Sequence, residues 1–189
     1  MSTVAKLIYV TNVSLDGFIE DEHGDFDWTE PDDEQFAFIT DLIRPVGTYL
    51  YGRRLYETMA VWETDPALAA QSELRADFAH VWQAADKIVY STTLDAVSTA
   101  NSRLERSFEP DVIRTIKDTA SRDLMVGGAN LAAHAFRARL IDECHLFIGP
   151  AIVGRGKPSL PSDLRAQLEL LDERRFDNGV VYVRHRILL

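Results

Sequence analysis

Three short segments of the sequence combine residue types that bind phosphate groups. They are Gly52-Arg53-Arg54, Ser91-Thr92-Thr93 and Gly127-Gly128-Ala129-Asn130, and each follows a short apolar run. Glycine lets a phosphate approach the backbone, a helix N-terminus adds partial positive charge, and arginine offers a fork of donors. If the preceding runs are parallel strands, the three segments meet at the carboxyl edge of one sheet. Together they predict a dinucleotide site that lacks the GxGxxG motif.

Each segment also has an ordinary structural explanation. The glycine pair can serve only a tight turn, the arginine pair can be a solvated helix start, and the hydroxyl run can be a loop. Packing alone would not require all three at the same edge. Their joint occurrence therefore favours a binding role.

The elements that must position these segments are strands alternating with helices. Apolar, β-branched runs predict strands at 6–13, 48–51, 87–90 and 124–126, a weaker strand near 103–107, and further strands at 143–148, 168–175 and 179–187. Helical patterns are expected from 31 to 44, at 53–59, at 66–85, around 112–116 and at 131–140. This order predicts an α/β fold in one domain, 1–189, with a mainly parallel central sheet and an antiparallel C-terminal hairpin.

Composition narrows the class of protein. The 189 residues are 46% hydrophobic and 26% charged, which is typical of a globular domain. A net charge of −10 argues against a nucleic-acid or anionic-membrane partner. The N-terminus carries no export signal pattern, so a cytoplasmic protein is expected. The single cysteine, Cys144, and five scattered histidines predict no metal site.

Several ordered motifs resemble the dihydrofolate reductase superfamily. The resemblance is strongest to its bacterial branch that is similar to the C-terminal reductase domain of the riboflavin-biosynthesis deaminase-reductase. The motifs that carry it are Ser14-Leu15-Asp16-Gly17-Phe18-Ile19, Gly52-Arg53-Arg54-Leu55-Tyr56-Glu57, Val126-Gly127-Gly128-Ala129-Asn130, Leu140-Ile141-Asp142-Glu143 and Pro150-Ala151-Ile152-Val153-Gly154-Arg155-Gly156. The resemblance implies a three-layer αβα arrangement of the dihydrofolate-reductase type.

The resemblance also implies NADPH as cofactor. Thr11 and Asn12, with the backbone near Ile19, would flank the nicotinamide carboxamide. Gly52, Arg53 and Arg54 would hold the pyrophosphate or the 2′-phosphate side, and Ser91 and Thr92 would line the adenosine ribose. The pyrophosphate cradle would be formed by Val126, Gly127, Gly128, Ala129, Asn130 and Leu131. In this family a cis peptide usually joins the two glycines, so one is expected between Gly127 and Gly128.

The substrate side follows from a second similarity. Trp28-Thr29-Glu30-Pro31-Asp32-Asp33 is similar to the segment of true dihydrofolate reductases in which a tryptophan and a proline precede the pterin-binding acid. By that spacing Trp28 would contact the substrate and Asp33 would be the catalytic acid, helping to protonate the ring as hydride arrives. The alternative is that Asp33 simply favours a helix start.

Two departures from the family bear on the substrate. The arginine that holds the folate tail has no counterpart in Ala84-Ala85-Asp86-Lys87, and Gly156-Lys157-Pro158-Ser159-Leu160 lacks a common aromatic residue. The expected function is therefore hydride transfer from NADPH to a C=N or C=O bond of a small pterin-, pyrimidine- or ribityl-like molecule. A weak true dihydrofolate reductase and a catalytically silent NADPH-binding or sensing protein remain alternatives. Edge strands near the C-terminus suggest a homodimer.

Overall fold

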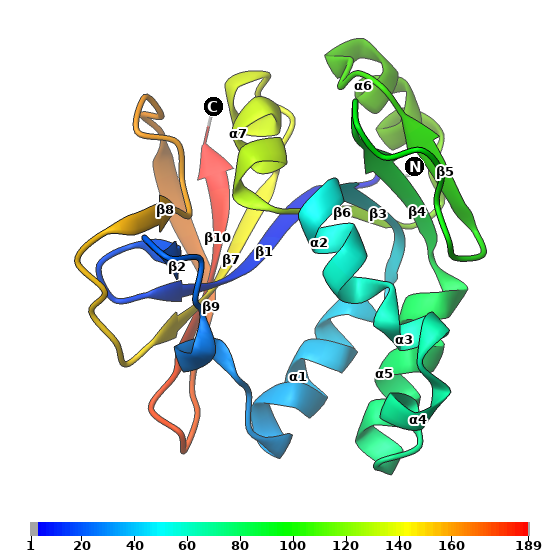
Figure 1. The fold of residues 1–189 in the computed structure, drawn as a ribbon. Coiled ribbons are helices and arrows are strands. Elements are labelled where there is room, and N and C mark those ends of the chain that lie inside the picture. The colour runs from blue at the N-terminus through cyan, green and yellow to red at the C-terminus, as the bar shows by residue number, and fades with distance from the viewer. Residues whose placement is uncertain (1–3, 189) are drawn as a thin grey trace.

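The computed structural model describes residues 4–188, which build one eight-stranded sheet and a small two-stranded sheet (Figure 1). The large sheet has the order β5-β4-β3-β6-β1-β7-β10-β9. Its strands are β1 (Leu7–Ser14), β3 (Val46–Gly52), β4 (Asp86–Tyr90), β5 (Ser102–Glu105), β6 (Asp123–Gly127), β7 (Glu143–Gly149), β9 (Gln167–Arg175) and β10 (Val181–Leu188). The small sheet pairs β2 (Phe18–Asp21) with β8 (Gly156–Pro158).

The direction of the strands follows the prediction. All pairs from β5 to β7 are parallel, whereas β10 runs antiparallel to both β7 and β9. The mainly parallel sheet with an antiparallel C-terminal hairpin is therefore confirmed. The β2–β8 pair was not predicted, because its short strands show no alternation of apolar and polar residues.

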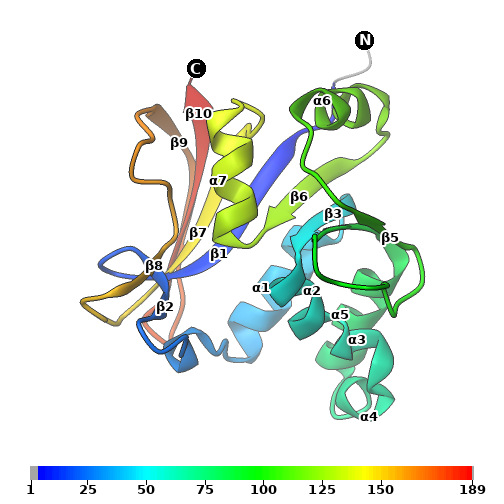
Figure 2. The same cartoon turned by 45° about the horizontal axis from the view of Figure 1, so that its top comes forward.

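Helices cover both faces of the sheet (Figures 1 and 2). One face packs on α6 (Pro110–Thr119) and α7 (Ala129–Arg137), and the other packs on α1 (Asp33–Ile43) and α5 (Glu73–Ala84). Strand β1 shows why both faces are buried, since Leu7 and Tyr9 enter one core and Ile8 enters the other. The three-layer αβα architecture is confirmed. The remaining helical turns are η1 (Asp27–Thr29), α2 (Arg53–Met59), α3 (Val61–Thr64) and α4 (Pro66–Ala69).

The expectation of one helix over 66–85 is wrong. The segment forms α4 and α5, separated at residues 70–72. The Ser72 side chain accepts a hydrogen bond from the Arg75 N–H at 3.2 Å and so starts a new helix. The apolar stripe itself was read correctly, because Phe78, Val81 and Trp82 of α5 are buried.

The family-like motif around Asp16 has a structural role. Asp16 accepts a hydrogen bond from the Ser14 hydroxyl at 2.7 Å and from the backbone N–H groups of Val153 and Gly154 at 3.1 and 2.7 Å. These bonds lower the pKa of Asp16, with the Ser14 bond as the largest cause. Asp16 thus ties the loop after β1 to the loop after β7, which explains why both motifs occur in one chain.

The N-terminal half of β7 carries a buried charge cluster. Glu143 accepts hydrogen bonds from Lys6 Nζ at 2.7 Å and Arg184 Nε at 2.8 Å, and its Oε2 lies 3.2 Å from His145 Nε2. Burial would raise the pKa of Glu143, but the bonds from Arg184 and Lys6 outweigh it and hold this pKa at about 2. Burial is also the main cause that lowers the pKa of His145, to about 4.

This cluster predicts acid sensitivity of the fold. Both folded-state pKa values lie below the unfolded ones, so their stabilisation is complete above the unfolded pKa and is lost as the pH falls. For His145 the window runs from pH 6.5 down to about 4, and for Glu143 from pH 4.5 down to about 2. We expect urea unfolding across this range to show a falling free energy of unfolding. Between pH 6.5 and about 4, the free energy of unfolding should fall less steeply in His145→Gln than in wild type, whereas His23→Gln, at an exposed position, should behave like wild type. The same pH dependence in wild type and His145→Gln would contradict the assignment.

Candidate functional site

The three segments singled out in the sequence lie at one edge of the large sheet. In the strand register Gly52 of β3 stands opposite Tyr90 of β4, and Tyr51 stands opposite Gly127 of β6. The turns after β4, β3 and β6 are therefore consecutive along the carboxyl edge. Their predicted convergence is confirmed, whereas their role in binding stays a prediction.

Arginines from the start of α2 connect neighbouring parts of this edge. Arg53 Nη1 donates to Thr93 Oγ1 at 3.0 Å, and its Nε donates to Glu57 Oε1 at 2.8 Å. Arg54 Nη1 lies 3.3 Å from Glu20 Oε1 of β2, so this contact joins α2 to the small two-stranded sheet. Both guanidinium groups are exposed, which leaves them accessible to an anion.

The turn after β4 is held by a further arginine. Ser91 Oγ accepts hydrogen bonds from the N–H groups of Thr93 and Leu94 at 3.2 and 2.9 Å. Arg106, directly after β5, donates through Nη1 to the carbonyl oxygens of Ser91 and Leu94 at 3.0 and 2.6 Å. The exposed Thr92 lies at the tip of this turn. Arg53 and Arg106 thus place two cations beside one turn that carries three hydroxyl groups.

The glycine pair forms the entry to α7. Gly128 has φ of +91°, a conformation that favours glycine, and a Cβ added there would meet no protein atom within 4 Å. The expected cis peptide between Gly127 and Gly128 is wrong, because residues 4–188 contain no cis peptide; the positive φ of Gly128 makes the turn instead. Val126, Ala129 and Leu131 are buried, so they offer a ligand only backbone groups.

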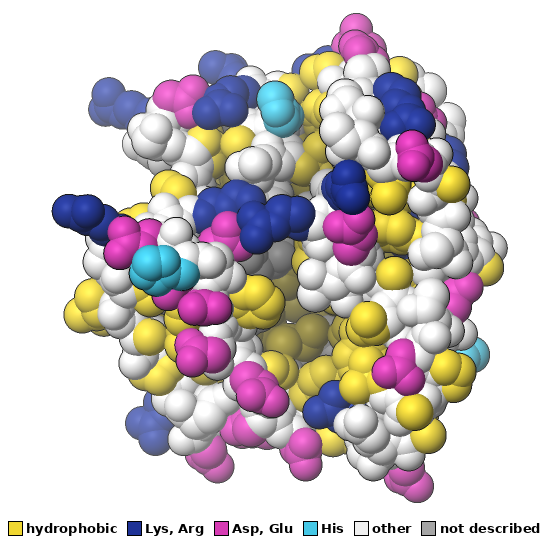
Figure 3. All heavy atoms as spheres, viewed as in Figure 1, with side chains coloured by type: hydrophobic (Ala, Val, Ile, Leu, Met, Phe, Trp, Pro, Cys, Tyr) yellow, Lys and Arg dark blue, Asp and Glu magenta, His cyan; other side chains and the backbone are white. Residues whose placement is uncertain are grey.

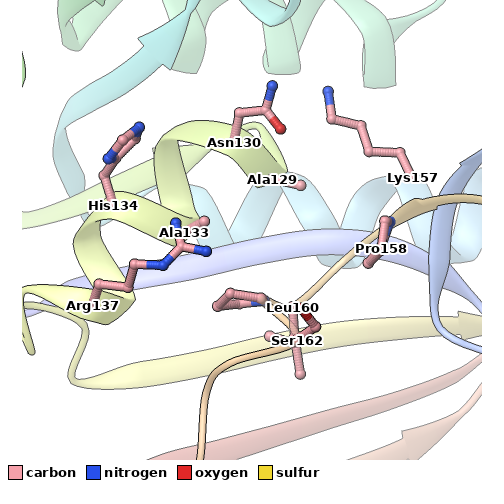
Figure 4. A pocket seen from close by; sticks show the side chains of 10 residues that line it. Ala129, Asn130, Ala133, His134, Arg137, Lys157, Pro158, Leu160 and Ser162 are labelled. Carbon is pink, nitrogen blue, oxygen red and sulfur yellow. The ribbon is translucent and has the colours of Figure 1, made fainter.

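Beyond the start of α7, polar side chains line a hollow of about 360 Å³ between this helix and residues 157–162. Figure 4 shows Asn130 and the Lys157 ammonium reaching the same space, with His134 and Arg137 further along the helix. Arg137 is paired with Asp163 at 2.9 Å. Lys157, which forms no ion pair within residues 4–188, is therefore the uncompensated cation of this hollow.

A second, apolar cavity of about 270 Å³ lies beside Gly127 and Leu55 of α2. Its lining includes the polar side chains Thr11, Asn12 and Tyr51, together with Gly127. Burial raises the pKa of Tyr51 well above 10, so the phenol stays neutral. The rest of the lining is apolar: Val10, Pro31, Phe36, Ile39, Ile43, Leu55, Met59, Trp62, Phe78, Met125 and Phe147. Figure 3 shows the hollow on this face, with Lys and Arg side chains above and hydrophobic side chains below.

The residues predicted on the substrate side lie outside the lining of this cavity. Asp33 is the first residue of α1 and is exposed, while Asp32 caps the helix by accepting from Gln35 N–H at 2.8 Å. Trp28 packs near Gly149, and its indole N–H is buried without a hydrogen-bond partner among residues 4–188. Ile19 lies in β2. The catalytic role of Asp33 and the substrate contact of Trp28 stay predictions.

Some residues of the edge were missed by the sequence analysis. Arg106 directly follows β5, but the sequence analysis placed the weak strand at 103–107 and so put this residue inside it; the rule that parallel strands end at one edge could otherwise have identified it. Lys157 was noted only within a loose motif. The position of Lys157 close to α7 depends on the tertiary fold. The same holds for the aromatic residues Phe36, Trp62 and Phe78, which come from three helices and line one cavity.

Comparison with known proteins assigns the family. Residues 5–182 match the family described as RibD C-terminal domain, and the chain belongs to this family. The chain is 26% identical, over 94% of its own length and 93% of the other protein, to the uncharacterized protein YyaP of Bacillus subtilis (strain 168).

Solved structures agree on the fold. A putative riboflavin biosynthesis protein from Shewanella sp. PV-4 superposes with a TM-score of 0.75 at 18% identity, covering 97% of this chain and 99% of that one. Dihydrofolate reductase from Enterococcus faecalis, complexed with NADP(H), gives a TM-score of 0.61 at 14% identity over 99% of both chains. The dihydrofolate-reductase-like fold is thereby confirmed, and the family supports a reductase of this general type. Among residues 4–188, no helix is both long and apolar enough to cross a membrane.

The packing of the glycine pair yields a test of the edge geometry. A methyl group at Gly127 would clash with the side chain of Leu55 and lie 3.1 Å from the Tyr51 ring, whereas at Gly52 it would meet nothing within 4 Å. We expect Gly127→Ala to lower the free energy of unfolding by about 2 kcal/mol through overpacking. Gly52→Ala, at a helix N-cap, should cost only about 0.3 kcal/mol. Equal urea midpoints for the two variants would show that β6 and α2 are not in close contact.

Proposed function

We propose that the protein is an NADPH-dependent reductase that transfers hydride to a C=N or C=O bond of a small molecule. One observation carries the proposal: Gly127, in the edge turn after β6, also lines the uncharged cavity, together with Thr11 and Asn12. A dinucleotide needs both environments, because its phosphates require cations and donors while its nicotinamide ring favours an apolar, water-poor site.

The residues at the edge fit such a cofactor. The open space beside Gly128 would admit a pyrophosphate against the backbone at the N-terminus of α7, with Asn130 and Lys157 nearby. Arg53, Ser91, Thr92 and Arg106 would hold the adenosine ribose and its 2′-phosphate, which favours NADPH over NADH. Thr11 and Asn12 would orient the carboxamide. When bound, the reduced nicotinamide supplies the hydride.

The cavity lining contains no side chain suited to donate the proton that the substrate needs after hydride transfer. None of the lining side chains is a carboxylate or a histidine, and burial raises the pKa of the Tyr51 phenol well above 10, which makes it a weak acid. A proton delivered by solvent at the cavity mouth would complete the reduction. The missing carboxylate also argues against efficient dihydrofolate reduction, since a pterin is held by an acid.

A second candidate, a catalytically silent NADPH-binding protein, is favoured by the exposure of Asp33. A screen that follows NADPH oxidation against cyclic imines and carbonyl compounds separates the two. Oxidation with any acceptor supports the reductase, and cofactor binding without oxidation supports the silent protein.

Cofactor binding itself can be tested with two glycines of similar backbone geometry. Gly128 and Gly179 have φ of +91° and +87°, and Gly179 lies in the β9–β10 hairpin. Alanine at either position should cost about 1 kcal/mol of stability. Only Gly128→Ala should weaken NADPH binding, by about tenfold or more, because its methyl group would occupy the phosphate space. Isothermal titration measures this, and an unchanged NADPH affinity in Gly128→Ala would contradict the proposed cradle.

The role of Asp33 has its own test. Because its carboxylate is exposed and lies outside the cavity lining, we expect Asp33→Asn to keep turnover of an identified acceptor within about twofold of wild type, as the neighbouring Glu34→Gln should. Steady-state kinetics with saturating NADPH is the measurement. A loss of about tenfold or more in Asp33→Asn alone would restore the carboxylate as the catalytic acid.

The expected homodimer also remains a proposal. Strand β9 ends the large sheet, and its Leu168 and Leu170 are 48% and 56% exposed. An unpaired edge strand that exposes leucines can pair with another strand, although the charged residues of β9 limit this tendency. A second copy of the chain would cover it.

A further inference from the structure

The wall of the apolar cavity contains a cluster of three aromatic side chains. Phe36 of α1, Trp62 of α3 and Phe78 of α5 form what we call the aromatic wall. Their ring centroids lie 5.2 Å apart for Phe36–Phe78, 5.9 Å for Phe36–Trp62 and 4.6 Å for Trp62–Phe78. Flat aromatic surfaces of this kind favour a flat apolar ligand, which can stack against them.

The lining would accept few polar groups. It includes no charged side chain, and its hydrogen-bonding side chains are Thr11, Asn12 and Tyr51. A sugar or phosphate placed against the aromatic wall would lose its water without gaining donors or acceptors in return. The part of the substrate that fills the cavity is therefore apolar.

A cation lies against the outer part of this wall. The Arg75 Cζ is 5.9 Å from the centroid of the Phe36 ring, and Arg75 lies one helical turn before Phe78 on α5. Among the described residues no ion pair or side-chain hydrogen bond involves its guanidinium. The nearby Asp77 is already paired with Arg44 at 2.6 Å. Arg75 is not part of the cavity lining, but a partly buried guanidinium without an ion pair, packed near a ring that lines the cavity, is a suitable anchor for one anion.

We propose that the cavity binds a flat, apolar molecule whose outer end carries an anionic group, and that Arg75 binds this group. The proposal deepens the proposed function, on which it rests for the identity of this molecule as the hydride acceptor. The anionic end can be a carboxylate or a phosphate, since a guanidinium binds both. The two charge-bearing parts of the complex would then lie apart, with the cofactor phosphates at the sheet edge and the substrate anion at α5.

Two fluorescent probes of similar shape and different charge test the site. 8-Anilinonaphthalene-1-sulfonate is flat, apolar and anionic, and N-phenyl-1-naphthylamine is its uncharged counterpart. We expect the intact protein to bind one equivalent of each. Arg75→Gln should weaken the anionic probe about tenfold and the neutral probe less than about twofold, and Arg75→Lys should restore most of the loss.

Variants of α1 locate the probes. Phe36→Ala should weaken both probes about tenfold, because it removes part of the aromatic wall. Phe38→Ala is the matched control, since Phe38 lies on the same helix but outside the cavity lining. Its ring centroid is 6.0, 5.4 and 4.9 Å from those of Phe147, Phe176 and Tyr182. Phe36→Leu keeps most of the side-chain volume and replaces Phe36→Ala in the probe titrations if Phe36→Ala does not fold. Competition by 2-naphthoate and by 2-naphthyl phosphate then distinguishes a carboxylate from a phosphate at the outer end.

The outcomes separate this proposal from the proposed function. Three results would overturn the substrate site. The wild type binds neither probe, or Arg75→Gln binds the anionic probe as tightly as wild type does, or Phe36→Ala and Phe36→Leu bind both probes as tightly as wild type does. NADPH titration of the same wild-type protein is independent of these probes. A protein that binds the probes as expected but does not bind NADPH would retain the site and lose the reductase assignment.

Discussion

The parallel register of β4, β3 and β6 is the constraint on which the site depends. Backbone hydrogen bonds align Gly52 with Tyr90 and Tyr51 with Gly127, so three turns far apart in the sequence end at the same level. In a parallel sheet every such turn leads to a crossover on one face or the other, and the carboxyl edge stays open for ligands. A shift of one residue in any of these strands would move its turn and reverse its inward side chains.

The sheet edge is charged and exposed to solvent, whereas the adjoining cavity is lined by uncharged side chains. The edge carries the cations Arg53, Arg54, Arg106 and Lys157, of which Arg53 and Arg54 are paired with Glu57 and Glu20 at the exposed surface. The cavity behind Thr11 and Asn12 has only neutral groups and aromatic walls. Gly127 belongs to both environments, since it ends β6 at the edge and lines the cavity.

Several residues that look chemically active maintain the structure instead. Lys87 is fully buried and donates to the carbonyl oxygens of Trp82, Gln83 and Ala85 at 3.2, 3.3 and 2.9 Å, so it caps the end of α5 just before β4. It occupies the region in which the family resemblance leads one to look for a ligand-binding arginine. Glu143 and His145 likewise stabilise β7 and β10, away from the edge.

The resemblance of the ordered motifs indicated the family. The sequence by itself determined the order of strands and helices along the chain, the parallel sheet with its antiparallel hairpin, and the three turns at one edge. These follow from local periodicity and from turn residues, which act over a few positions, and from the rule that parallel strands end together. Only the tertiary structure decided the β2–β8 pair and the cavity, because each depends on groups that meet from distant segments. The break at Ser72 and the turn at Gly128 are local, through an N-cap and a positive φ, and the helix and cis-peptide predictions misjudged them. Phe36, Trp62, Phe78 and Arg75 come from three helices, and no spacing along the chain indicates that their side chains share one wall.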